Sequence, residues 1–132
     1  LYPGLNYNFK YHQDHIHPKS FFNKLNLRSQ GMNEESVEAF LKRYNSLPNL
    51  QLLQATQNIE KSDKHFEDWL KKIHPDESDR TSFLQQHHIH SKCSLKFNDF
   101  LDFHEARKDK LKLEFAKHLN VKLADTEDEA VS

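Results

Sequence analysis

The pattern of apolar and polar residues differs between segments of the chain, so that some segments are predicted to be strands and others helices. Residues 9–16 are predicted as a strand anchored by Phe9, Tyr11 and Ile16 among many polar residues, and the short apolar run at 50–53 predicts a second strand. Apolar residues at helical spacing predict helices over 34–45, from Thr56 to Ile73, over 79–88 and over 97–119. The pattern therefore predicts an α+β fold that is mostly helical overall.

The predicted core consists of the apolar residues that recur on one face of these segments. Charged residues alternate along 97–119, which is typical of a solvated helix face. Residues 124–132, ADTEDEAVS, have little to bury and predict an acidic, flexible tail. The core residues expected in the first part of the chain are Phe9, Tyr11, Ile16, Phe21, Phe22, Leu25, Leu27, Val37, Phe40, Leu41, Tyr44, Leu50, Leu52 and Leu53. Those expected in the second part are Ile59, Phe66, Trp69, Leu70, Ile73, Phe83, Leu84, Phe97, Phe100, Leu101, Leu111, Phe115 and Leu119.

Composition narrows the class of protein. With 132 residues, 36% hydrophobic and 30% charged, the chain suits one globular domain. No apolar run approaches the ~20 residues that span a bilayer, and a single cysteine, Cys93, excludes an internal disulfide, which suits a cytoplasmic location. The net charge of -1 gives no overall attraction to a polyanion, and the absence of a GxxxxGK[ST] loop argues against an NTPase. Because Met32 is the only methionine, residue 1 is no initiator, and we expect a piece of a longer protein.

One group of polar residues suits phosphodiester cleavage. Asp14 and His15 stand together at the end of the first predicted strand, and Asn49 and Asn58 lie nine residues apart around the second. An imidazole with a reference pKa of about 6.5 can deprotonate water, so His15 is the predicted general base. The oxygens of Asp14 and Asn58 suit Mg²⁺, or Mn²⁺, better than Zn²⁺. Asn49 is expected to brace the loop that holds His15.

Other polar residues give weaker evidence for a functional role. Lys61 and Lys64 follow Asn58 at one-turn spacing and could meet a phosphate, as could His17, but lysines at such positions are commonly just solvated. The segment QHHIHSKC places three histidines close to Cys93, which leaves a zinc-stabilised helical interaction domain as an alternative.

The segments DHIHPKSFF, PNLQLL and NIEKSDKHF resemble the HNH nuclease family, also called ββα-metal or His-Me finger, as it occurs at the C-terminus of GmrSD-type restriction endonucleases. They are also similar to the HNH domain of RNA-guided CRISPR nucleases. The resemblance implies a hairpin and helix core over 11–66, within a nuclease domain over 1–123 that helices at 79–119 close. It makes His15 the general base, Asn49 the middle residue of the motif, and Asp14 and Asn58 the ligands of one Mg²⁺. Cleavage to a 5′-phosphate and a 3′-hydroxyl is implied.

Two features depart from the simplest HNH pattern. Roughly thirty residues separate the strands, which leaves the fold intact if they loop outward, and Asn58 stands where a histidine is common. The resemblance implies DNA as the partner, a role in restriction or phage defence, and a ParB-like domain upstream. A homodimer would be needed to cut both DNA strands in one encounter. The alternative function is an HNH-like module that binds nucleic acid or protein without cutting.

Overall fold

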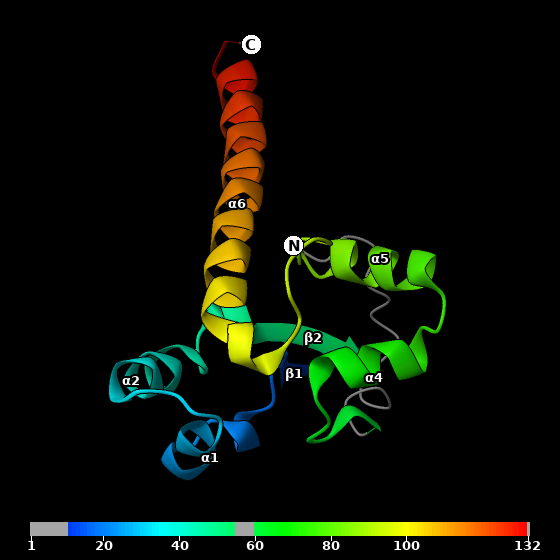
Figure 1. Ribbon diagram of the computed structural model, residues 1–132. Helices are drawn as coiled ribbons and strands as arrows, with labels where there is room; N and C mark the ends of the chain where they lie inside the picture. Colours follow the sequence, from blue (N-terminus) through cyan, green and yellow to red (C-terminus); the bar gives the residue numbers. More distant parts are fainter. Residues whose placement is uncertain (1–10, 55–59, 132) are drawn as a thin grey trace.

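The computed structural model describes residues 11–54 and 60–131, with side chains described over 11–53 and 60–119. A small sheet lies at the base of a long helix, with shorter helices on either side (Figure 1). This confirms the predicted α+β fold that is mostly helical. The elements in chain order are β1 (Tyr11–His15), η1 (Lys19–Phe21), α1 (Lys24–Ser29), α2 (Glu34–Arg43), η2 (Leu47–Asn49), β2 (Leu50–Gln54), α4 (Phe66–Ile73), α5 (Glu77–Gln86), η3 (Phe97–Asp99) and α6 (Phe100–Val131).

The sheet is a single antiparallel pair. β1 pairs with β2 in a register that sets His15 opposite Leu50 and Asp14 opposite Gln51. The ladder continues past the strand end, because the amide of Ile16 donates to the carbonyl of Asn49 over 2.8 Å. Both predicted strands are therefore present, although residues 9 and 10 of the first lie outside the described residues.

The connection between the strands, residues 16–49, forms part of the core. It holds α1 and α2, and the Asn33 side chain caps α2 by accepting from the amide of Ser36 over 2.8 Å. Leu27, Val37 and Phe40 from this connection are buried in the hydrophobic core. The insertion therefore does not loop outward but supplies part of the core.

The predicted core is largely right in this part of the chain, but Tyr11, Leu50 and Leu52 are only partly buried and lie outside the core cluster. Phe22 and Leu27 are buried, but Leu25 is 83% exposed. Leu25 and Leu27 are two residues apart, and such residues point about 200° away from each other around an α-helix. α1 therefore cannot bury both on one face.

The helix predicted to run from Thr56 to Ile73 is interrupted. Glu60 and Lys61 are helical, but Ser62 has a φ of 43°, which lies in the left-handed region and ends a right-handed helix. α4 begins only at Phe66 and buries Phe66, Trp69 and Leu70 as expected. Residues 55–59, including Thr56 and Ile59, lie outside the described residues. α5 agrees with the helix predicted over 79–88.

The last helix is longer than predicted. Instead of ending near residue 119, α6 continues to Val131 through the acidic segment expected as a flexible tail. Leu111 is 5% exposed, whereas Phe115 is 44% and Leu119 59% exposed, so the last two are not core residues. These two core predictions failed because α6 leaves the body of the domain after Leu111 (Figure 1). Among the residues described, none of the helices has the length and apolar content needed to cross a bilayer.

Aromatic rings fill the centre of the domain. Phe22 contacts Phe40, Phe97 and Phe100 with ring centroids 4.8 to 6.1 Å apart. Fully burying each such ring stabilises the fold by about 1.5–3 kcal/mol. These rings come from the strand connection, from η3 and from α6, so they fix the base of α6 against the end of β1.

Candidate functional site

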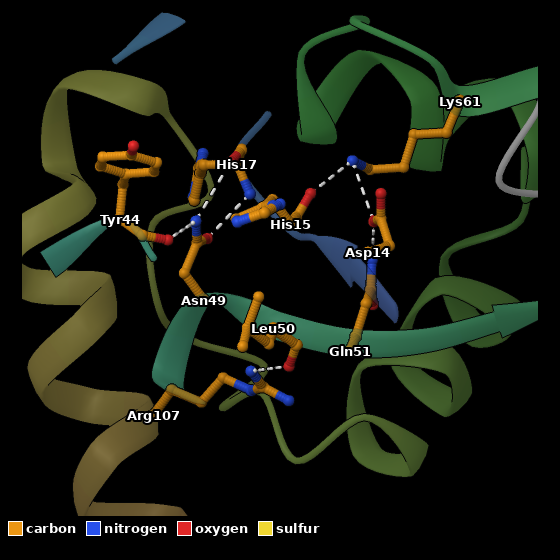
Figure 2. Close-up of polar contacts among 9 residues, drawn as sticks. All are labelled: Asp14, His15, His17, Tyr44, Asn49, Leu50, Gln51, Lys61 and Arg107. Carbon is orange, nitrogen blue, oxygen red and sulfur yellow. Dashed lines mark hydrogen bonds and ion pairs between the residues drawn. The ribbon is translucent and has the colours of Figure 1, made fainter. Parts of the chain in front are cut away.

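Asn49 ties together three parts of the chain at the end of the hairpin (Figure 2). Its Oδ1 accepts from the amide of His17 over 2.9 Å, and its Nδ2 donates to the carbonyls of His17 and Tyr44 over 3.1 and 2.9 Å. The side chain is fully buried. These are the contacts expected of a residue that braces the loop after His15, since the turn after β1 is held to the end of α2 and the start of β2.

His15 stands at the end of β1 and is partly exposed. Its Nε2 lies 2.9 Å from Oδ1 of Asn45, an exposed residue that follows α2. Because an amide oxygen only accepts, Nε2 carries the proton in a neutral ring and Nδ1 keeps its lone pair. The Tyr44 ring lies 6.1 Å away on one side. The contact with Asn45 therefore orients the imidazole.

Asp14 points into a different polar cluster. Its Oδ2 accepts from Nε2 of Gln51, the cross-strand neighbour, over 2.9 Å and lies 3.1 Å from Nζ of Lys61. The Asp14 side chain is 10% exposed. Figure 2 shows the carboxylate directed toward Lys61 and Gln51, while the His15 ring points toward Asn49. Successive strand residues face opposite sides, so the two side chains diverge although they are adjacent in sequence.

Lys61 is the residue whose environment differs most from expectation. Its side chain is fully buried, and Nζ donates to the carbonyl of His15 over 2.8 Å as well as pairing with Asp14. Burial lowers the pKa of Lys61, and the nearby carboxylate of Asp14 opposes that shift. A buried ammonium in these contacts has no surface to present to a phosphate, so Lys61 positions Asp14 and His15 in this structure. Lys64 is exposed and donates to the carbonyl of Glu60 over 2.7 Å.

His17 lies in the aromatic core. It is 1% exposed, and its ring meets that of Phe103 edge-on at 4.7 Å and that of Phe100 at 5.7 Å. Burial lowers the pKa of His17 to about 3, and the positive charge of Lys61 adds to the effect. A neutral ring surrounded by phenylalanines does not contact substrate in this conformation, so we treat His17 as a core residue.

The histidines before Cys93 do not gather around a common point. His87 is buried and stacks on Phe83 at 4.1 Å, and burial lowers its pKa to about 3. His90 is exposed and its Nδ1 accepts from the amide of Lys92. Over residues 11–53 and 60–119, whose side chains are described, no three His, Cys, Asp or Glu side chains form a group that could hold a metal ion.

The described residues contain one of the two predicted cation ligands, Asp14. Both contacts of Asp14, with Gln51 and Lys61, involve its Oδ2. Asn58, the second predicted ligand, lies outside the described residues. Lys61 already neutralises part of the Asp14 charge, so a cation there would share the carboxylate with an ammonium.

Three residues of this site were not singled out from the sequence. Gln51 and Asn45 hold Asp14 and His15, and Arg107 of α6 supports the strand end by donating to the carbonyls of Leu47, Pro48 and Leu50. Arg107 also donates to the carbonyl of His87 over 3.0 and 3.2 Å. Only the cross-strand register could have pointed to Gln51, and no local pattern identifies the other two.

Comparison with known proteins adds no assignment. No protein-family model matches the chain, and no curated protein matches it either.

Proposed function

We propose that this domain is a metal-dependent DNA endonuclease of the HNH type, acting in the cytoplasm in restriction or phage defence. The observation that carries the proposal is the placement of His15, a partly exposed imidazole at a braced strand end with Nε2 beside Oδ1 of Asn45. In the neutral tautomer that donates from Nε2 to Asn45, Nδ1 carries the lone pair that would take a proton from water, and general bases of this kind contribute about 10²–10⁴-fold to a rate. The HNH-like order of Asp14, His15, Asn49 and Asn58 adds the substrate class.

Each residue has one task in this proposal. Lys61 holds the carbonyl of His15 and Asn49 holds the backbone of His17, so the imidazole is positioned before substrate arrives. Asp14 and Asn58 would hold Mg²⁺, which when bound supplies charge stabilisation at the phosphate. Lys64, which is exposed and lies three residues after Lys61, is a cation that would contact a DNA backbone.

The test is nicking of supercoiled plasmid DNA with and without Mg²⁺. We expect His15→Ala to lower the nicking rate by at least about 100-fold, and Asn45→Ala to lower it less, because only the orientation of the ring is lost. His90→Ala is the matched control, since His90 is an exposed histidine outside the site. Circular dichroism checks that the variants fold. Nicking by His15→Ala at the wild-type rate would exclude His15 as the base.

One observation favours the second candidate, a binding module that does not cut. The Asp14 carboxylate is already paired with a buried ammonium, which satisfies part of the charge that a metal would need. Calorimetric titration of Mg²⁺ into the wild-type chain and into Asp14→Asn separates the two functions. Heat of binding that disappears in Asp14→Asn supports the nuclease, whereas DNA binding without any Mg²⁺ binding supports the module.

A further inference from the structure

Lys61 fills the position beside Asp14 that a bound cation would take (Figure 2). Its Nζ lies 3.1 Å from Oδ2 of Asp14 and donates to the carbonyl of His15 over 2.8 Å. The Lys61 side chain is fully buried, and that of Asp14 is 10% exposed. Carboxylate and main-chain carbonyl oxygens are the donors that hard divalent cations take from proteins. The ammonium is therefore a cation of the chain itself, held by two oxygens of the kind that hold metal ions.

Gln51 offers a further oxygen next to the same carboxylate. Its Nε2 donates to Oδ2 of Asp14 over 2.9 Å, whereas its Oε1 is buried and has no hydrogen-bond partner among the described residues. Gln51 as a whole is 3% exposed. A buried acceptor without a donor is unfavourable. A half-turn of the terminal amide exchanges its nitrogen and oxygen, and this would direct Oε1 to a cation bound at Asp14.

The charges at Asp14 balance one cation. Burial lowers the pKa of Lys61, and the carboxylates of Asp14 and, after it, Asp63 oppose that shift. Asp63 is exposed, so Asp14 is the carboxylate that is buried together with the ammonium. Two positive charges a few ångströms apart repel each other strongly where little water separates them. A divalent ion at Asp14 must therefore displace the ammonium, or bind weakly beside it.

We propose that Lys61 competes with the divalent cation for Asp14 and sets the affinity of the metal site. The identity of the ion rests on the proposed function. In the metal-free chain the ammonium holds Asp14 and the carbonyl of His15 in place, so the end of β1 is positioned before any metal arrives. The ion loads only at a concentration that overcomes this competition. The site without the lysine then has the higher affinity.

Binding of Mn²⁺ to the purified chain tests the competition, because electron paramagnetic resonance measures the unbound ion directly. We expect Lys61→Met to bind Mn²⁺ at least about tenfold more tightly than the wild type, because the ammonium beside the carboxylate is gone. Lys64→Met is the matched control. It removes an exposed ammonium three residues away and should change the affinity by less than about threefold. Adding Asp14→Asn to Lys61→Met should abolish the gain.

Stability gives a second measurement on the same variants. Mn²⁺ at about 10 mM should raise the urea midpoint of Lys61→Met by more than that of the wild type, because the ion replaces the missing positive charge. If Lys61→Met is unfolded without metal, the ion should restore its helical circular dichroism signal for the same reason.

Four results would each overturn the proposal. These are a gain in affinity below about tenfold, an equal gain in Lys64→Met, a gain that survives Asp14→Asn, and a Lys61→Met chain that Mn²⁺ neither stabilises nor refolds. The measurements need neither DNA nor cleavage. Nicking by His15→Ala at the wild-type rate would remove the general base but leave the competition standing, whereas an unchanged Mn²⁺ affinity in Lys61→Met would remove only the competition.

Discussion

Replacing Lys61 by methionine isolates the ion pair beneath the hairpin. Methionine keeps an unbranched apolar stem of similar length, so the packing near Trp69, whose ring lies 6.0 Å from Nζ, is largely retained. The substitution removes the ammonium that contacts Asp14 at 3.1 Å and the His15 carbonyl at 2.8 Å. The carboxylate is then left 90% buried with Gln51 as its remaining described partner.

The expected cost follows from this burial. Removing one partner of a buried ion pair costs about 3–5 kcal/mol because the other charge stays uncompensated. Since Gln51 still donates to Asp14, we expect the lower end, a loss of about 3 kcal/mol in the free energy of unfolding. Urea denaturation followed by circular dichroism should show a midpoint lowered by about 2 M, for a slope of about 1.5 kcal/mol/M.

Two further variants make the result specific. Lys64→Met removes an exposed ammonium three residues away and should change the stability by less than about 0.5 kcal/mol. Adding Asp14→Asn to Lys61→Met removes the uncompensated charge and should recover about 1–2 kcal/mol relative to the single variant. If Lys61→Met lies within about 1 kcal/mol of wild type, or matches Lys64→Met, the ion pair does not have the energetic role that its burial implies.

Three more predictions concern the same base of the domain. Because burial lowers the pKa of His17 and of His87 from 6.5 to about 3, the unfolded chain binds a proton at each below pH 6.5 that the folded chain does not. The free energy of unfolding should therefore fall by about 2 kcal/mol for each of these histidines between pH 7 and pH 5. In urea titrations at both pH values, His17→Phe should show a fall smaller by about 2 kcal/mol than the wild type, and an unchanged pH dependence would contradict this. Asn49→Ala removes the partner of the His17 amide and of the carbonyls of His17 and Tyr44, and should lower the free energy of unfolding by about 3 kcal/mol or more. The control Asn33→Ala removes a helix cap and should lower it by about 1 kcal/mol. Equal shifts of the two variants in thermal unfolding would contradict this. Arg107→Lys cannot reach all four carbonyls and should cost about 2–4 kcal/mol in the same assay; a loss under about 0.5 kcal/mol would mean that the fork geometry is unimportant.

The secondary structure was predictable where the signal is local. β2 and α2 follow from apolar spacing and from Asn33 as a cap, which act within a few residues of the segment they define. The break at Ser62 was not predictable in the same way. Serine is no strong helix breaker, and the polar run KSDK gives no apolar period by which an interruption could be noticed.

The site was predictable only in part. Asn49 was expected to brace the loop after His15, and its hydrogen bonds to His17 do so. The burial of Lys61 was not foreseen, because its carboxylate partner lies 47 residues earlier and lysines are almost always solvated unless paired. In α6, the spacing of Phe115 and Leu119 marks an apolar stripe correctly, but no pattern tells whether the body of the same chain covers it.

The long connection between β1 and β2 has a consequence for the order of folding. An ordinary hairpin zips up from its turn, whereas closing a loop of about 34 residues costs roughly 2 kcal/mol more entropy than closing one of four. We therefore expect α1, α2 and their rings to condense first in the folding transition state, and the two strands to register against each other later. Refolding kinetics would show this as higher φ-values for Val37→Ala than for Leu53→Ala, two buried apolar truncations on either side of that step.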